Sequence, residues 1–288
     1  MANLKLAYPD NVSGNFFVDT TCIDCDLCRQ IAPSVFKEAS DHSFVFRQPE
    51  SNSETHRAAM ALVACPTASI GTRDKVDSHS AATAFPEIVD DNVYFCGYAS
   101  RDSYGASSYL IVRPEGNILI DSPRYAQTLV KRIEEMGGVA LMLFSHQDDV
   151  ADHDQFHRHF GCARVIHRAD SRGIDAEQLM DGDDPIPLES DLVAIPVPGH
   201  TRGHVVFLYR NKFLFTGDHL AWSDNRQGLI AFRDVAWFSW KRQTESMKRL
   251  LDYRFEWVLP GHGRRAHIAA DRMRESLVDC IRWMESKP

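Results

Sequence analysis

The chain has 288 residues, of which 44% are hydrophobic and 25% are charged, and its formal net charge is −8. This composition is ordinary for a soluble globular protein, and the length allows two domains. The acidic balance argues against a nucleic-acid-binding surface, because contacts to phosphates need clustered Lys and Arg. No apolar run reaches the length of a bilayer span, so we expect neither nucleic acid nor membrane as a partner.

Four cysteines near the N-terminus are the first chemical signal. Cys22, Cys25 and Cys28 are each separated by two residues, and the distant Cys65 is followed by Pro66. This pattern is typical of the ligands of one [4Fe–4S] cluster and resembles that of single-cluster ferredoxins. The alternative, a zinc ribbon, would require a second Cys-x-x-Cys pair, which the sequence lacks. A disulfide framework is disfavoured because the chain opens without a secretory leader, so we expect the cytoplasm or another reducing compartment.

The elements around these cysteines predict a compact N-terminal domain over residues 1–75. Residues 16–18 are expected to form a strand, and residues 35–36 and 44–46 a hairpin. A helix over residues 54–63 would deliver Cys65 at its end. Residues 76–91, which are rich in Ser, Ala and Asp, are expected to be a linker.

From residue 92 to 288 the pattern changes to short apolar runs separated by turn signals. Expected strands cover residues 93–98, 108–112, 117–121, 141–144, 164–167, 192–197, 205–209, 213–215 and 257–259. Expected helices cover residues 126–136, 152–160, 241–251 and 268–284. Clusters of strands with helices between them indicate a layered α/β domain built on packed sheets.

Four loops that follow predicted strands contain most of the side chains able to bind a metal. They cover residues 145–153, 198–204, 216–219 and 260–263. Imidazole and carboxylate groups suit borderline divalent metals. The order of these segments resembles the metallo-β-lactamase-fold superfamily across residues 92–288. The resemblance implies an α+β ferredoxin-like N-terminal domain followed by an αββα metallo-β-lactamase-type sandwich.

The resemblance also implies two divalent metals, Fe or Zn, and a residue for each ligand position. His146 and His200 would bind the first metal, Asp152, His153 and His262 the second, and Asp218 would bridge them. Asp218 and Asp152 are the carboxylates that we expect to be catalytic.

The chain departs from the family pattern where a second histidine is expected. That position holds Asp148, and two extra residues then precede Asp152. Either Asp148 or Asp149 replaces the missing imidazole, or the first metal is left under-coordinated, and we favour Asp148. A carboxylate there suits iron or manganese, and flavodiiron proteins also have a carboxylate at that place.

The sequence therefore predicts a binuclear metalloenzyme that acts on a small-molecule substrate. We favour an oxidoreductase in which the [4Fe–4S] domain passes electrons from an external donor to a diiron site. The alternative is a hydrolase of an ester, thioester or lactone that uses metal-bound hydroxide, with a structural or regulatory cluster. About 25 residues follow Gly263, too few for the substrate domain of glyoxalase II, so a glutathione thioester is not favoured. A non-catalytic sensor is a third hypothesis.

Overall fold

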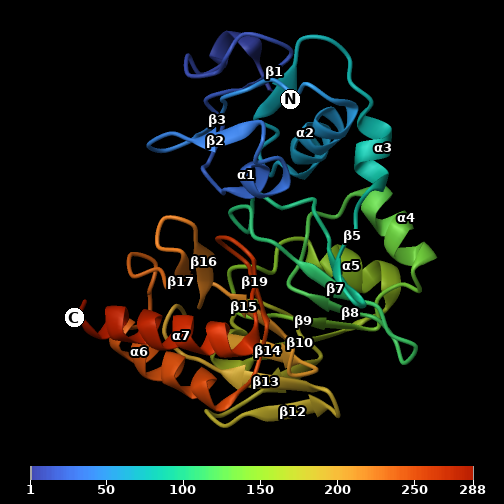
Figure 1. Cartoon of the computed structure of the whole chain (residues 1–288). Helices are drawn as coiled ribbons and strands as arrows, with labels where there is room; N and C mark the ends of the chain where they lie inside the picture. Colours follow the sequence, from blue (N-terminus) through green and yellow to red (C-terminus); the bar gives the residue numbers. More distant parts are fainter. Residues whose placement is uncertain (1, 288) are drawn as a thin grey trace. The chain divides into compact units, whose positions relative to one another are not determined.

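The computed structural model describes residues 2–287, and its backbone divides into two compact units (Figure 1). The first contains the chain up to residue 140 together with residues 151–161, and the second contains residues 141–150 and the chain from residue 162. This division groups the first strands after residue 92 with the cysteine region, whereas the sequence analysis expects a boundary before them.

The cysteine region of the first unit contains two small antiparallel sheets and two helices. The predicted strand and hairpin are present, with Phe36 opposite Val45 in the hairpin. The longer helix begins after Ser51, whose side chain accepts a hydrogen bond from the amide of Glu54, and it ends directly before Cys65. The elements are η1 (Leu4–Leu6), β1 (Phe16–Val18), α1 (Leu27–Ile31), β2 (Phe36–Glu38), β3 (Ser43–Val45), α2 (Asn52–Ala64) and β4 (Ile70–Thr72).

The segment expected to be a linker is not an irregular connection. It contains α3 (Ser78–Thr83) and β5 (Glu87–Asp90). Asp77 starts this helix, because its carboxylate accepts hydrogen bonds from two amides of the first turn. Ala81 is fully buried, so the helix packs even though its composition is typical of a loop.

The remainder of the first unit consists of four antiparallel strands and two helices. The strands lie in the order β8-β7-β6-β5, and β7 and β8 are buried along their whole length. The elements are β6 (Val93–Phe95), β7 (Tyr109–Ile111), β8 (Ile118–Ile120), α4 (Gln127–Glu135) and α5 (His153–Phe160).

The second unit contains three parallel strands and a six-stranded sheet. The parallel strands are β9 (Leu141–Leu143), β10 (Ala163–His167) and β11 (Gln178–Met180), with η2 (Arg168–Asp170) after β10. The six-stranded sheet has the order β12-β13-β14-β15-β18-β19. Its strands are β12 (Ile186–Glu189), β13 (Leu192–Pro196), β14 (Val205–Tyr209), β15 (Phe213–Gly217), β18 (Trp257–Pro260) and β19 (Ala266–His267).

Two helices cover one face of the six-stranded sheet and share a hydrophobic cluster with its strands. They are α6 (Trp240–Arg249), followed by η3 (Leu250–Asp252), and α7 (Ala270–Glu285), and they lie side by side in Figure 1. Alternate strand residues such as Val206, Leu208 and Leu214 pack in one cluster with Met247 and Leu277 of the helices. A small hairpin, β16 (Ala221–Ser223) and β17 (Gly228–Ile230), also contacts α7.

Every residue of β13 except Val193, and all of β14 and β15, is buried. Strands that are buried on both faces are typical of the inner layers of a sandwich. Among residues 2–287, no helix combines the length and the apolar character that crossing a bilayer requires.

Candidate metal centre

Strand direction explains why loops far apart in the sequence meet in the second unit. Because β13 and β15 are both antiparallel to β14, they run in the same direction, and β18 is parallel to β15. The loops after these three strands therefore leave the same edge of the sheet. The amide of Val205, at the start of β14, donates to the carbonyl of Ser145 at 2.8 Å, which ties the loop after β9 to that edge.

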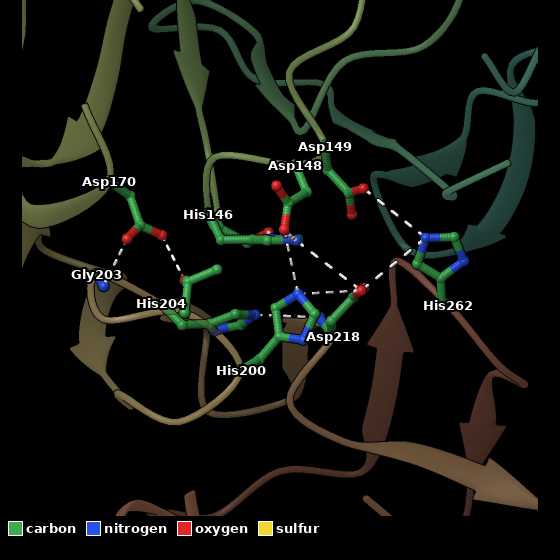
Figure 2. A network of polar contacts seen from close by, with 11 residues as sticks. His146, Asp148, Asp149, Asp170, His200, Gly203, His204, Asp218 and His262 are labelled. Atoms are coloured by element: carbon green, nitrogen blue, oxygen red, sulfur yellow. Dashed lines mark hydrogen bonds and ion pairs between the residues drawn. The ribbon is translucent and has the colours of Figure 1, made fainter. Parts of the chain in front are cut away.

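The first ligand group combines His146, Asp148 and His200, whose donor atoms all lie within 4.8 Å of one another (Figure 2). Nε2 of His200 is 3.5 Å from Oδ2 of Asp148, and Nε2 of His146 is 3.8 Å from the same oxygen. Asp148, the favoured replacement for the missing imidazole, thus lies close to both histidines predicted for the first metal, and its role as a ligand stays a prediction.

The second group combines His146, Asp149 and Asp218 within the same limit. His262 adjoins this group, because its Nε2 is 3.9 Å from Oδ1 of Asp149 and 4.0 Å from Oδ2 of Asp218. Asp149 is 1% exposed, whereas the side chain of Asp148 is 48% exposed, so the two neighbouring carboxylates have different surroundings. The sequence analysis considered Asp149 only as a replacement for the missing imidazole.

His146 belongs to both groups, and one oxygen of Asp218 lies within 4.0 Å of histidines on both sides of the centre. Oδ2 of Asp218 lies 3.9 Å from Nε2 of His146, 3.6 Å from Nε2 of His200 and 4.0 Å from Nε2 of His262. These distances are too long for hydrogen bonds. They leave space for cations between the ligand atoms, as the predicted bridging role of Asp218 requires.

Asp152 and His153, at the end of the first of the four loops, belong to the first unit, whereas the other ligands described above belong to the second. Both carboxylate oxygens of Asp152 accept hydrogen bonds, from the amide of Tyr125 at 2.7 Å and from the side-chain amide of Gln155 at 2.9 Å. Nδ1 of His153 is 3.6 Å from the carboxylate of Asp154. The roles of Asp152 and His153 as metal ligands remain predictions.

Burial and the nearby carboxylates set the charge of the site. Burial lowers the pKa of His146 to about 4, although Asp218 opposes the effect. Burial also opposes protonation of His200, but Asp148 and Asp218 outweigh it and raise the pKa of His200. Burial favours a neutral Asp218, yet His262, His146 and His200 outweigh it and lower the pKa of the carboxyl group. The site therefore holds ionised carboxylates beside a neutral imidazole, which is the form in which both bind metals.

Hydrogen bonds behind the ligands fix their orientation. The hydroxyl of Ser145 is 2.9 Å from Nδ1 of His146, which directs Nε2 of that ring toward the other ligands. The amide of Asp218 donates to Nε2 of His204 at 3.1 Å. Asp170 accepts hydrogen bonds from the amide of Gly203 at 2.7 Å and from the hydroxyl of Thr201, and so holds the loop of His200. Ser145 lies in the first predicted metal loop, but its supporting role and that of Asp170 are not expected from the sequence, because no local pattern marks them.

Two observations fit a metal at this site. Among residues 2–287, Nε2 of His146 and Oδ1 of Asp218 are buried without a hydrogen-bond partner, which is costly unless a cation binds them. Gly261 also makes room for the carboxylates, since a Cβ there would lie 2.5 Å from Oδ2 of Asp149 and 3.1 Å from Oδ1 of Asp218. The nitrogen and oxygen donors suit zinc, iron or manganese.

The four predicted cluster cysteines line one cavity in the first unit, together with Ser43 and Thr67. Burial raises the pKa of the Cys25 thiol to about 12 and that of Cys28 well above its usual value. Thiolates at these positions therefore need a strong positive charge next to them, which the iron atoms of a cluster supply.

Ion pairs within the loop that carries three of these cysteines stabilise its conformation. The buried guanidinium of Arg29 pairs with Asp24 and Asp26, both of which have a positive φ. Gly105, in the connection between β6 and β7, touches the same loop from outside. A Cβ at Gly105 would lie 2.6 Å from Cβ of Cys25, so only glycine allows this approach.

Comparisons with known proteins agree with both parts of this description. Residues 18–72 match the family model described as the 4Fe-4S single cluster domain of ferredoxin I. A hydroxyacylglutathione hydrolase from Pelagibacter ubique is 30% identical over 127 residues, which cover 42% of this chain and 52% of that protein. A lactamase-like protein from Pestalotiopsis microspora is 26% identical over 192 residues, covering 62% and 55%. The chain spans about half the length of the curated relatives that it matches.

Solved structures with a similar fold include metallo-β-lactamases. The enzyme from Pontibacter korlensis has a TM-score of 0.54 at 17% identity, over 69% of this chain and 98% of that one. The FIM-1 enzyme from Pseudomonas aeruginosa, in a mono-zinc form, has a TM-score of 0.53 at 16% identity, over 70% and 95%. The chain thus has a ferredoxin-type domain at residues 18–72 and a metallo-β-lactamase-like sandwich, and the predicted fold class is confirmed.

Proposed function

We propose that this protein is a binuclear metal-dependent hydrolase of an ester or thioester, to which a [4Fe–4S] domain is attached. The observation that carries the proposal is the position of Asp218, with one oxygen within 4.0 Å of Nε2 of three histidines. One carboxylate oxygen among three imidazoles is an arrangement suited to bridging two cations.

Each ligand has a role in this proposal. His146, Asp148 and His200 would hold one metal, Asp149 and His262 the other, and Asp218 both. Two divalent metals there would lower the pKa of a bound water to about 7 and would supply positive charge near the reacting oxygen. The chain itself contributes an apolar wall, because Trp237 and Phe238 are 67% and 46% exposed. The ring of Trp237 lies 6.3 Å from the ring of His200, so this wall adjoins the ligands and suits the apolar part of an acyl group.

The relatives support hydrolysis over the oxidoreductase that the sequence analysis favours. One matched relative is a hydroxyacylglutathione hydrolase, and solved structures with a similar fold are metallo-β-lactamases. Neither kind of match favours electron transfer to a second site. In this proposal the four cysteines hold one [4Fe–4S] cluster with a structural or regulatory role.

The test is hydrolysis by protein purified without oxygen, with iron and zinc counted on the same sample. We expect turnover of 4-nitrophenyl butyrate or of an acyl thioester, with two metals beyond the four irons of the cluster. Asp218→Ala should abolish turnover and remove these two metals while the cluster absorbance stays. Turnover that persists in Asp218→Ala would contradict the proposal.

An oxidoreductase is the second candidate, and a specific observation favours it. The first ligand group contains a carboxylate where the family pattern has an imidazole, and the neighbouring Asp149 adds another. A site rich in carboxylates suits iron better than an all-histidine set does. About six irons per chain with little zinc, together with consumption of oxygen by the chemically reduced protein, would favour this candidate over the hydrolase.

A further inference from the structure

The second unit has a cavity of about 560 Å³ that none of the metal ligands lines. Its lining includes Arg168, Asp181, Pro198, Arg202, Phe238 and Arg242. A cavity of this volume is in the usual range of sites for small molecules. We name it the arginine cavity, because three of its lining residues are arginines.

Two of the three arginines are paired within the cavity wall. Nε of Arg168 donates to Oδ2 of Asp181 at 2.7 Å, and a guanidinium nitrogen of Arg242 is 3.7 Å from the carboxylate of Asp183. Among residues 2–287, Arg202 has no ion-pair partner, and its side chain is exposed. The lining therefore carries one positive charge that the protein does not neutralise, in a chain whose net charge is −8.

The backbone on both sides of Arg202 is held in place. Asp170 accepts a hydrogen bond from the hydroxyl of Thr201, the residue before Arg202. It accepts another from the amide of Gly203, the residue after Arg202, which Figure 2 shows. Elsewhere in the lining, the amide of Ala169 donates to Nδ1 of His167, so the ring proton is on Nε2, which donates to the carbonyl of Gly182 at 3.0 Å. Walls fixed in this way lower the entropy that a bound ligand would lose.

The arginine cavity and the metal centre share one loop. Pro198 and Arg202 lie two residues before and after His200, and the amide of Phe238 donates to the carbonyl of His200 at 3.0 Å. A ligand in the cavity would thus contact the loop that carries a metal ligand and the apolar wall beside it.

We propose that the arginine cavity binds the carboxylate or phosphoryl group of a small organic anion, with Arg202 as its main contact. A guanidinium binds both groups through paired, charge-assisted hydrogen bonds. If the bound anion is part of the substrate, the substrate is an ester or thioester with an acidic group on its acyl part. This assignment of the substrate class rests on the proposed hydrolase function.

Direct binding tests the cavity without any reference to catalysis. Succinate and inorganic phosphate are titrated into the intact protein by calorimetry, and the Kd of each is compared among the unsubstituted protein, Arg202→Gln and Arg210→Gln. Arg210 is the control because it is also exposed on the second unit but is paired with Asp191. We expect Arg202→Gln to weaken binding at least tenfold and Arg210→Gln to leave it unchanged. The tighter of the two anions identifies the chemical group, and equal binding by all three proteins, or no binding, would overturn the proposal.

Two matched esters test the substrate class. 4-Nitrophenyl hemisuccinate carries a carboxylate where 4-nitrophenyl butyrate carries a methyl group. We expect Arg202→Gln to raise KM for the hemisuccinate about tenfold with little change in kcat, and to leave both constants for the butyrate unchanged. If Arg202→Gln changes KM equally for the two esters, the proposed substrate class is wrong. Anion binding through Arg202 in a protein that hydrolyses neither ester would sink the hydrolase function and leave the cavity assignment intact.

Discussion

The cysteine cavity and the histidine–aspartate centre are both sets of metal ligands, but they are assembled at different ranges along the chain. Three of the four cysteines lie within seven residues, and the fourth directly follows α2. The ligands of the other centre come from loops after four strands that are distant in sequence. A local set depends on the conformation of one loop, whereas a distributed set depends on the register of a whole sheet.

The largest effect is expected from a substitution of Cys65, the one cluster cysteine that is distant in sequence from the other three. Cys65→Ser should abolish the broad visible absorbance of the cluster, because a cubane bound by three thiolates is open to solvent at the fourth iron. The measurement is the absorbance of anaerobically purified protein per chain. Cys162→Ala, at a buried cysteine outside the cavity, should keep the spectrum. An unchanged spectrum in Cys65→Ser would remove Cys65 from the ligand set.

The corresponding change in the distributed centre is Asp218→Ala. We expect loss of both metals of that centre, because one oxygen of Asp218 is close to histidines of both groups. Elemental analysis should still find the irons of the cluster. Asp252→Ala, at an exposed aspartate outside the four loops, is the control. Retention of both metals by Asp218→Ala would exclude a bridge.

A smaller loss of metal should distinguish Asp149 from Asp152 as the ligand of the second metal. Asp149→Ala should lower the metal content of the centre from two to one, because Asp149 is buried beside His262 and Asp218. Asp152→Ala is the matched comparison, since the resemblance assigns the same metal to Asp152. Full metal content in Asp149→Ala together with loss in Asp152→Ala would restore the assignment made from the sequence.

The smallest expected effect concerns the strands behind the distributed centre. The buried Arg164 of β10 donates to the carboxylate of Glu177, and this contact lowers the pKa of Glu177 to about 2. Because the folded pKa lies below the unfolded one, the stabilisation is present above about pH 4.5 and is lost as the pH falls toward 2.

Glu177→Gln should therefore lower the free energy of unfolding by about 1 kcal/mol at pH 7, a value kept small because the carboxylate is partly exposed to solvent. The difference from the unsubstituted protein should shrink at pH 3. Urea unfolding at both pH values measures it, and Glu115→Gln, at an exposed residue, should show no difference at either. A difference that grows on acidification would contradict the assigned pKa.

The separation along the sequence of the residues that interact also explains which features could be predicted from the sequence. The cysteine set, the hairpin and the helix that ends before Cys65 follow from local spacing, and the structure contains all three. The four metal loops were found because each carries a short motif after a strand. The placement of Asp149 could not be found in this way, because two extra residues leave the alignment of the first loop ambiguous.

Other features leave no local trace in the sequence. Asp170 supports the loop of His200 from a turn about 30 residues earlier, and only the fold brings the two together. The helix at residues 78–83 was missed because its composition is that of a linker, whereas Asp77 and the buried Ala81 determine its structure. The arginine cavity likewise combines residues from separate segments that carry no motif.

The contact of Gly105 with the cysteine loop limits how freely the parts of this chain can be exchanged. A side chain at this position would collide with Cβ of Cys25 and crowd Pro66, so the β6–β7 connection and the cysteine loop fit each other at a seam. A cysteine region exchanged without the β6–β7 connection would have to reproduce this close approach at Gly105. The cysteine region and the β6–β7 connection should therefore be exchanged together. In a chimeric protein, the junction between the two parent sequences should lie outside residues 1–106.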